Sequence, residues 1–325
     1  MTVLLELVAP HTAGDPMSEQ KWLNCRLSDI RQRLEERGHR VSKPVISRLL
    51  REQDYSLRAN RKQAVGKQHP ERDQQFRHLQ AQRMTHQAAG HPVISVDTKK
   101  KELVGNFKNN GQIWWQEAEE VDAHDFPQDA VGRAVPYGIY DVQHNRGTVY
   151  VGQSADTPAF AVDNIAHWCA TEMQERFPGA THLLLEADSG GSNSARSHVW
   201  KERLQAQVAD RFGLQVTVCH YPTGASKWNP IEHRLFSEIS KTWAGCPLRS
   251  FERVIGYIEE TRTATGLQVK AYRVMASYAT GGKVASGVMA GLSIEAHDVC
   301  PQGNYTISPR LPAAPSPLNQ ELILL

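Results

Sequence analysis

Cysteine is scarce in this sequence, and its few copies lie far apart. The 325 residues contain five cysteines, an odd number, and no two of them form a C-x-x-C pair. This scatter argues against a disulfide scaffold and against a structural zinc site. It suits a reducing compartment, so we predict a cytoplasmic protein.

Long apolar runs are also missing. No stretch of 18 apolar residues occurs in the chain. The first residues, MTVLLELVAPHTAGDP, contain a short apolar run that Glu6 interrupts, and no basic region precedes it. These features argue against a signal peptide and against a membrane-spanning helix. We therefore expect no membrane partner.

Neither sign of charge dominates the whole chain, but one segment is clearly basic. The net charge is +2 at pH 7 with a pI near 8.2, which does not by itself indicate a nucleic-acid binder. From residue 26 to residue 62, eleven Lys and Arg stand against five Asp and Glu. Such a local excess is typical of a module that binds a polyanion, although a solvated helical face has the same composition.

The basic segment contains the pattern of two short helices, one at 27–38 and one after Ser42. Ser28 and Ser42 are the expected N-caps, and Gly38 is the expected stop of the first helix. Apolar residues recur at helical spacing in both, namely Leu27, Ile30 and Leu34, then Val45, Ile46, Leu49 and Leu50.

Two short helices joined by a glycine-containing turn are typical of a helix-turn-helix. The polar side of the second helix carries Lys43, Ser47, Arg48 and Arg51, and we predict that these residues contact DNA. Many helical hairpins without this function look similar, so the pattern alone does not decide.

The rest of the chain has the pattern of a mixed α/β sheet with helices on its faces. Residues 58–90 are polar and helix-prone, which predicts a connecting helix followed by a linker. Strands are predicted at 92–107, 111–117, 135–142, 147–153, 181–188 and 215–222, and helices at 163–177, 194–212, 229–243 and 250–262. After about Tyr272 we expect irregular structure and a loose tail.

Three carboxylates stand at unusual places in this pattern. Asp97 closes the apolar run VISV, Asp188 closes LLLEA, and Glu232 lies in the first turn of the helix that NP opens. In α/β sheets, functional groups collect where strands end at a crevice. The three carboxylates can therefore converge although they are far apart in sequence.

A cation gives a chemical reason to gather them. Three carboxylates in one cleft raise each other's pKa unless a cation neutralises them. Mg²⁺ prefers hard oxygen ligands, and two ions roughly 3.5–4 Å apart activate the attacking oxygen and stabilise the leaving oxygen of a phosphodiester. We predict two Mg²⁺ ions, for which Mn²⁺ can substitute. Lys99, Lys100 and Lys101 would then offset the acids and hold a DNA backbone.

Each carboxylate also has a purely structural explanation. Aspartates such as Asp97 and Asp188 often begin turns at strand ends. Asn229 as N-cap, Pro230 at the first helical position and Glu232 two residues later form a capping box without catalytic content. All three acids together, in strand–strand–helix order, are much harder to explain as turns and caps.

Longer motifs around these residues resemble a known family. They are GDPMS, YSLRANRKQ, HPERDQQF, PVISVDTKKKELVGNFKN, LEADSGGSN and WNPIEHRLFSEIS. With them, the chain from about His11 to Arg310 resembles bacterial insertion-sequence transposases of the DDE type, in particular the Rhodopirellula transposase family.

The resemblance implies a fold and a domain order. The expected fold class is α/β, a ribonuclease H-like mixed sheet flanked by helices, as in retroviral integrases, preceded by a small all-α helix-turn-helix domain. The expected segments are a DNA-binding domain shortened at its N-terminus (1–65), a helical linker (66–90), the DDE catalytic domain (91–270) and an irregular C-terminal segment with a tail (271–325).

The resemblance also implies site residues. Asp97, Asp188 and Glu232 match the first, second and third catalytic acids, which hold the metal ions. Asn193 and Asn229 lie in the matched motifs and are expected to shape the site. The full set of expected DNA-binding residues is Lys43, Ser47, Arg48, Arg51, Arg61, Lys62, Lys99, Lys100, Lys101 and Lys227.

The implied function is transposition of a bacterial insertion sequence. The protein would bind terminal inverted repeats of double-stranded DNA as a homodimer or higher oligomer, associate with the nucleoid, and catalyse Mg²⁺-dependent strand cleavage and strand transfer. Two departures from the family pattern favour catalytic chemistry over full transposition competence: only Met1 to Ala13 precede GDPMS, and PQGNYTI lacks the tryptophan expected before Asn304.

Two alternatives stay open. One is a catalytically inactive DNA-binding relic or repressor from a truncated element copy, which would bind repeats without regard to Mg²⁺. The other is a structure-selective nuclease of the same fold, which would cut DNA but never join it. The basic N-terminal helices favour sequence-directed binding over the nuclease.

Overall fold

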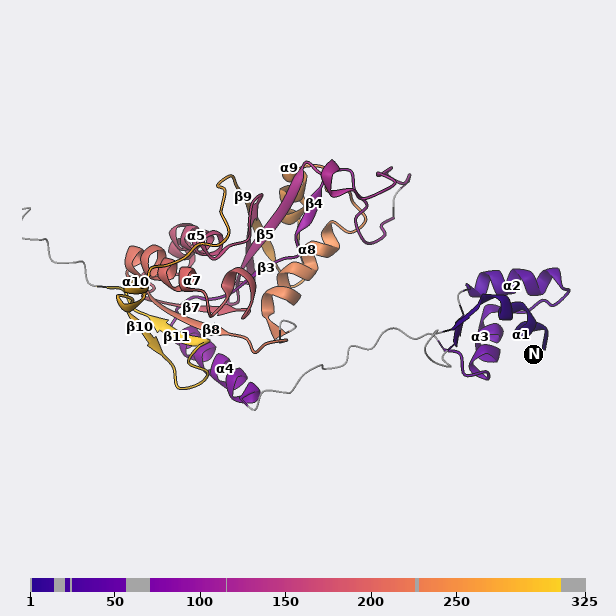
Figure 1. The fold of residues 1–325 in the computed structure, drawn as a ribbon, viewed down its shortest axis with the longest axis horizontal. Helices are drawn as coiled ribbons and strands as arrows, with labels where there is room; N and C mark the ends of the chain where they lie inside the picture. The colour runs from indigo at the N-terminus through magenta and orange to yellow at the C-terminus, as the bar shows by residue number, and fades with distance from the viewer. Residues whose placement is uncertain are drawn as a thin grey trace, which may run out of the picture. The chain divides into compact units, whose positions relative to one another are not determined.

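The computed structural model describes residues 2–14, 21–23, 25–56, 71–114, 116–225 and 228–310 (Figure 1). The chain divides into two compact units, Met1–Lys67 and Gln68–Leu325. Three of the predicted DNA-binding residues, Arg61, Lys62 and Lys227, lie outside the described residues. Among the residues that the structure describes, no helix is long and apolar enough to cross a membrane.

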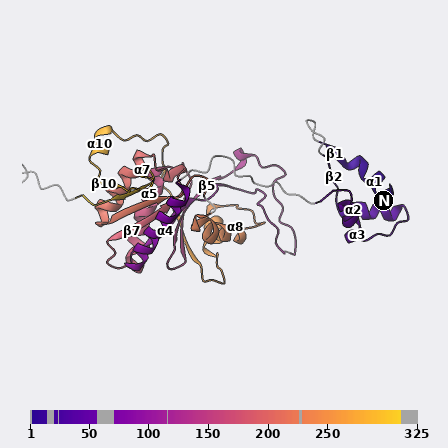
Figure 2. The ribbon, with the colours of Figure 1, turned by 90° about the horizontal axis from the view of Figure 1, so that it is seen from below.

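The first unit packs three short helices around a small apolar core. Its elements are α1 (Thr2–Val8), α2 (Leu27–Glu36), α3 (Lys43–Arg51) and an antiparallel pair of strands, β1 (Thr12–Gly14) and β2 (Lys21–Leu23) (Figure 2). The buried side chains are Leu4, Val8, Ile30, Leu34, Ile46 and Leu50. Helix α1 was not predicted, because seven residues are too few to display a helical period.

The cap residues of α2 and α3 agree with the predictions from the sequence, with one exception. Gly38 has a φ of +84°, and the N–H of His39 donates to the carbonyl of Leu34 over 2.8 Å, so the predicted glycine stop is confirmed. Ser42 occupies the N-cap position of α3, as predicted. The N-cap prediction for Ser28 was wrong. Arg26 holds that position, because its carbonyl already accepts the first helical hydrogen bond, from the N–H of Ile30.

The second unit is built on a nine-stranded mixed sheet. The strand order is β10-β11-β8-β7-β3-β5-β6-β9, with β4 paired to β5. The strands are β3 (Val93–Thr98), β4 (Glu102–Val104), β5 (Gly132–Asp141), β6 (Arg146–Gly152), β7 (His182–Ala187), β8 (Gln215–His220), β9 (Gln268–Val274), β10 (Ile294–Ala296) and β11 (Asn304–Ile307). Central β3 is antiparallel to β5 and parallel to β7, and β8 continues the parallel part. The predicted mixed sheet of an α/β fold is confirmed.

Helices cover both faces of this sheet (Figures 1 and 2). One face packs on α5 (Pro158–Trp168) and α7 (His198–Arg203) through a large core that includes Ile165, Trp168 and Trp200. The opposite face packs on α4 (Arg72–Ala88), α8 (Ser237–Thr242) and α9 (Phe251–Glu259). The remaining helices are α6 (Gln174–Arg176) and α10 (Ser286–Ala290). Three helical segments contain a π-helical stretch. Cys169–Met173 continues α5, Leu204–Asp210 continues α7, and Glu232–Phe236 precedes α8.

Three segment predictions need correction. The strand expected at 111–117 is absent from its described residues, and the side chain of Trp114 is fully exposed, so nothing buries that apolar stretch. Helix α4 is not a linker, because Leu79 packs against buried residues of β3 and β7. The segment after Tyr272 is not wholly irregular. Strand β11 pairs with β8 and buries Tyr305 and Ile307.

Candidate active site

Parallel pairing of β3 and β7 brings two of the acids together. Val96 is the partner of Ala187 in the parallel register. The residues that follow them, Asp97 and Asp188, therefore lie next to each other at the carboxyl ends of neighbouring strands. Each carboxylate accepts a hydrogen bond from the next backbone N–H, that of Thr98 over 2.7 Å and that of Ser189 over 2.5 Å. The strand ends thus fix both aspartates beside each other.

The helix that carries Glu232 begins directly against β3. The hydroxyl of Ser95 donates to the side-chain oxygen of Asn229, and the N–H of Ile231 approaches the same hydroxyl at 3.4 Å. The Asn229 side chain is therefore directed at the sheet, which disagrees with the capping-box explanation of Glu232. This contact sets the position of Glu232 relative to Asp97, two residues along β3.

A glycine on the next strand allows the helix to approach so closely. Gly138 of β5 is the register partner of Asp97, and a Cβ atom at this position would lie 2.5 Å from the ring of Phe236 and 2.9 Å from Ile231. A side chain here would push the helix away from the strand. Gly138 is therefore required by packing beside the acids, not by its backbone angles.

The acids influence one another electrostatically. The pKa of Asp97 is raised to about 7, first by burial and then by the negative charges of Asp188, Glu232 and Asp156, against the opposing hydrogen bond from the N–H of Thr98. Burial likewise raises the pKa of Glu232, Asp188 adds to the increase, and His233 and Lys99 oppose it. This mutual repulsion is what the sequence predicts for three acids in one place.

The acids face two adjoining clefts. Asp97 and Asp188 line a cleft of about 440 Å³ together with the loop at Gly190–Ser192. Glu232 lines a second cleft of about 350 Å³. Lys99 and Lys100 line both, so the two clefts share a wall.

The three predicted DNA-binding lysines of this region differ in environment. Lys99 is only 7% exposed, lies 3.3 Å from Glu102 and rests on the ring of Trp243. Lys100 is 76% exposed, and Lys101 lies 3.7 Å from Asp156 at the rim of the first cleft. Lys100 and Lys101 are accessible to a DNA backbone, whereas Lys99 mainly supports the wall of the site.

A fourth acid was missed by the sequence analysis. Asp156 lines the same cleft as Asp97, and its carboxylate accepts a hydrogen bond from the hydroxyl of Thr98 over 3.1 Å. In sequence, Asp156 directly precedes Thr157 and Pro158, the N-cap and first residue of α5, so it resembles an ordinary helix start. Only the tertiary fold brings it to the acids.

Asn193 stabilises the loop that follows Asp188. Its side-chain oxygen accepts a hydrogen bond from Tyr137 over 2.9 Å, and its carbonyl lies 2.8 Å from Nε2 of His220. Both contacts are buried. The expected role of Asn193 in shaping the site therefore has a structural basis in this loop.

The predicted N-terminal DNA-binding residues lie on α3. Lys43, Arg48 and Arg51 are exposed, Ser47 is half-buried, and Arg48 lies 3.8 Å from Glu52. On the opposite side of α3, Ile46 and Leu50 are buried in the core of the unit. The basic side of the helix is therefore available for a ligand.

Comparison with known proteins gives the family. A family model described as the Rhodopirellula transposase DDE domain matches residues 3–309. The chain belongs to this family. It is a DDE transposase, an enzyme of DNA transposition in the polynucleotidyl transferase class. The resemblance noted in the sequence motifs is thereby confirmed.

Solved structures of the Mos1 transposase are similar to this transposase. A paired-end complex with the left transposon end is 13% identical, covers 80% of this chain and 69% of its own, and has a TM-score of 0.45. The Mos1 mariner paired-end complexes with Mn and with Mg are each 13% identical and have TM-scores of 0.44. Each match covers 73% of this chain and 66% of the Mos1 chain. No curated protein matches the chain.

The contact between Ser95 and Asn229 leads to a first prediction. Ser95→Ala removes a buried hydroxyl and leaves Asn229 without this donor, at a cost of about 1–3 kcal/mol of stability. Because Glu232 then loses its support, we expect DNA cleavage to slow by roughly 10–100-fold while DNA affinity is retained. Thr261→Val is the matched control, since that buried hydroxyl donates to the carbonyl of Tyr257 at the end of its own helix and lies outside both clefts. Equal rates in the two variants would contradict the positioning role.

Proposed function

We propose that this transposase binds the terminal inverted repeats of its own insertion sequence, cleaves a DNA strand there and transfers the freed 3′ end to a target. The observation that carries the proposal is the register of β3 and β7, which aligns Asp97 with Asp188 at one sheet edge beside the Glu232 helix. The pKa values of Asp97 and Glu232, which are raised first by burial and then by neighbouring acids, support the assignment of these residues as catalytic acids.

The donor set fits divalent magnesium. Asp97, Asp188 and Glu232 offer hard carboxylate oxygens, and a cation would offset the burial and repulsion that raise the pKa values of Asp97 and Glu232. We propose that these residues hold two Mg²⁺ ions, with Mn²⁺ as a substitute. When bound, the ions would activate the attacking oxygen and stabilise the leaving oxygen of a phosphodiester.

The chain's own residues position the DNA for this reaction. Lys100 and Lys101 would hold backbone phosphates at the rim of the cleft. Cleavage breaks the bond between phosphorus and the 3′ oxygen by attack of water and leaves a 3′-OH. In strand transfer, that 3′-OH attacks a target phosphodiester and displaces the target's own 3′ oxygen. Neither step requires a covalent bond to the enzyme.

We further propose that α2 and α3 form a helix-turn-helix that recognises the repeat, with the enzyme acting as a dimer or higher oligomer on DNA. Exposed Lys43, Arg48 and Arg51 on α3 support this role. The predicted contacts of Arg61, Lys62 and Lys227 belong to the same proposal. A cytoplasmic, nucleoid-associated location follows from a DNA substrate.

The proposed function is tested with a labelled duplex that ends in the element's terminal repeat. With Mg²⁺ we expect both nicked and joined products. Cutting without joining would favour the structure-selective nuclease, and tight binding without cutting in either Mg²⁺ or Mn²⁺ would favour the DNA-binding relic.

Repeat recognition has its own prediction. In the double variant Arg48→Ala/Arg51→Ala, we expect affinity for the terminal repeat to fall roughly 10–100-fold, because two charged contacts are lost from α3. Fluorescence anisotropy at fixed salt measures this change. The control is Arg31→Ala, an exposed arginine on α2. Unchanged affinity in the double variant would refute the role of α3.

A further inference from the structure

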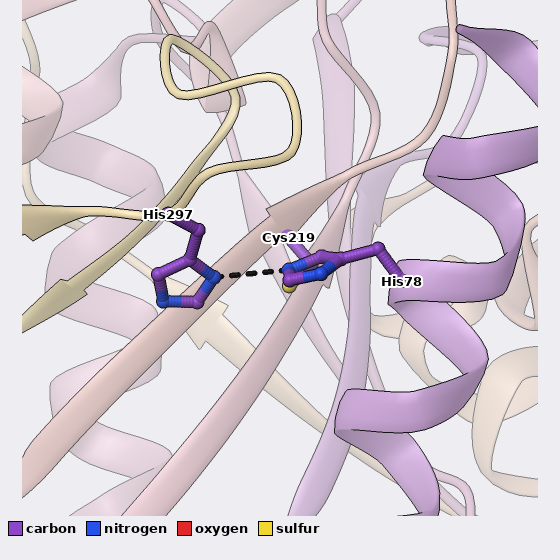
Figure 3. A group of neighbouring side chains, drawn as sticks. All are labelled: His78, Cys219 and His297. Atoms are coloured by element: carbon purple, nitrogen blue, oxygen red, sulfur yellow. Dashed lines mark hydrogen bonds between the residues drawn. The ribbon is translucent and has the colours of Figure 1, made fainter.

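Three potential metal ligands meet on the sheet face that α4 covers (Figure 3). His78 comes from α4, Cys219 from β8, and His297 from the residue after β10. One ligand atom of each residue lies within 4.8 Å of those of the other two. The group shares no residue with the clefts that the catalytic acids line.

The three ligand atoms lie within reach of a single tetrahedral metal ion. Nε2 of His78 and Nδ1 of His297 face each other at 2.9 Å, and the sulfur of Cys219 lies beside them (Figure 3). A tetrahedral ion with bonds of about 2.1 Å to nitrogen and 2.3 Å to sulfur holds its ligand atoms roughly 3.3–3.6 Å apart. Binding of the ion would require the two half-buried imidazoles to rotate away from each other and towards the sulfur.

A second contact is compatible with the tautomer of His297 that a metal site needs. Its Nε2 lies 2.8 Å from the hydroxyl of Thr306 on β11, which in turn lies 3.2 Å from the hydroxyl of Thr217 on β8. When Nε2 carries the proton and donates it to Thr306, Nδ1 keeps its lone pair on the side of His78. Metal-ligating histidines are typically oriented in this way by a partner on the other ring nitrogen.

An ion has a route to this group. His78 lines an open cleft of about 620 Å³ together with Asp73, Arg77 and Val299. The cleft gives access to the imidazole and leaves room for water as a fourth ligand. Cys219, by contrast, is fully buried among apolar residues such as Leu79 and Leu184.

We propose that His78, Cys219 and His297 bind one transition-metal ion of the Zn²⁺ type, with water as the fourth ligand. Two imidazoles and a thiolate select Zn²⁺ or Co²⁺ over Mg²⁺, which prefers oxygen. The ion would link α4, β8 and the segment after β10, and so fasten the last two strands to the sheet. It is a structural site, separate from the catalytic magnesium ions.

The competing explanation is a plain hydrogen bond between two histidines above a core cysteine. Burial lowers the pKa values of His78 and His297, which favours the neutral form of both rings and suits either case. Burial also raises the pKa of the Cys219 thiol, so a metal has to displace its proton. Metal binding, unlike the hydrogen bond, therefore releases a proton and strengthens as the pH rises.

The test uses the full-length protein, freed of metal with a chelator and then kept in excess Mg²⁺ to occupy the acidic cleft. Equilibrium dialysis against Zn²⁺ should give one ion per chain, and Co²⁺ should give the absorption bands of a tetrahedral cobalt thiolate. The melting temperature should rise with Zn²⁺, because the ion binds the folded state.

Variants decide between the two explanations. His297→Gln keeps a side chain that can hydrogen-bond, and we expect it to weaken Zn²⁺ binding at least about 100-fold and to remove the Zn²⁺-dependent rise in melting temperature. Cys219→Ser should abolish the cobalt–thiolate band. The controls are His198→Gln and Cys246→Ser, which lie outside the group. Absence of the band in the wild type, or full Zn²⁺ binding by His297→Gln, would overturn the proposal even if Cys219→Ser fails to fold.

Discussion

Asp97→Asn is expected to lower the rate of DNA strand cleavage at least about 1,000-fold while binding of the terminal repeat stays within a few-fold of wild type. The carboxylate would lose a metal ligand worth several kcal/mol of transition-state stabilisation. The basic face of α3 lies in the other unit of the chain and is unchanged by the substitution. Single-turnover cleavage and anisotropy on the same duplex measure the two effects.

The matched control is Asp129→Asn, an exposed acid in the same unit but outside both clefts. We expect it to cleave and to bind like the wild type. A parallel loss of binding in Asp97→Asn would mean that the carboxylate supports the fold or the DNA surface, and the catalytic assignment would then fail.

The stability of the metal-free transposase should rise as the pH falls from about 8 to about 5. The pKa of Asp97 is about 7 in the folded protein, above its ordinary value, so the folded state holds a proton that the unfolded chain releases. The free energy of unfolding therefore increases as the pH drops through this window. The charged carboxylate destabilises the folded state at pH 8 by between about 1 and 4 kcal/mol.

Chemical unfolding in the presence of a chelator measures this effect. Other groups titrate in the same range, so the informative quantity is the difference between wild type and Asp97→Asn. We expect the variant to be the more stable protein at pH 8 and the difference to vanish near pH 5. Added Mg²⁺ should stabilise the wild type at pH 8 and the variant much less. A variant that is less stable than wild type at pH 8 would refute the cost of the buried Asp97 charge.

The parts of the site that the sequence predicts are those with a local signal. The apolar runs before Asp97 and Asp188 indicate buried strands. An acid at the end of each run indicates that the two carboxylates meet where the strands end. The paired register of β3 and β7 agrees with that expectation. The NP that precedes Glu232 likewise begins a helix.

Other parts depend on contacts between distant segments. The segment that forms β11 is only four residues long, and it is extended because it pairs with the edge of β8. No local pattern in the sequence indicates this pairing. Asp156 resembles a helix start, and its approach to Asp97 depends on how β6 leads into α5. The chemistry of such residues follows from the fold and cannot be read from spacing.

The group of His78, Cys219 and His297 is the clearest example. Its three members come from a helix, a strand and a loop, and each resembles an ordinary core or surface residue in its own segment. The sparse cysteines argue against a zinc site built from neighbouring residues in sequence. They do not bear on one that the tertiary fold assembles.

We propose that Glu232 joins the two strand-end aspartates in one metal-dependent site that cleaves DNA. The most direct measurement is cleavage of the labelled terminal-repeat duplex in Mg²⁺ by wild type, by Glu232→Gln and by Glu238→Gln, a glutamate further along the same helical segment that pairs with Lys241. We expect metal-dependent cleavage by wild type and Glu238→Gln, and its loss in Glu232→Gln with repeat binding intact. Wild-type rates in Glu232→Gln would show that Glu232 is not a catalytic acid.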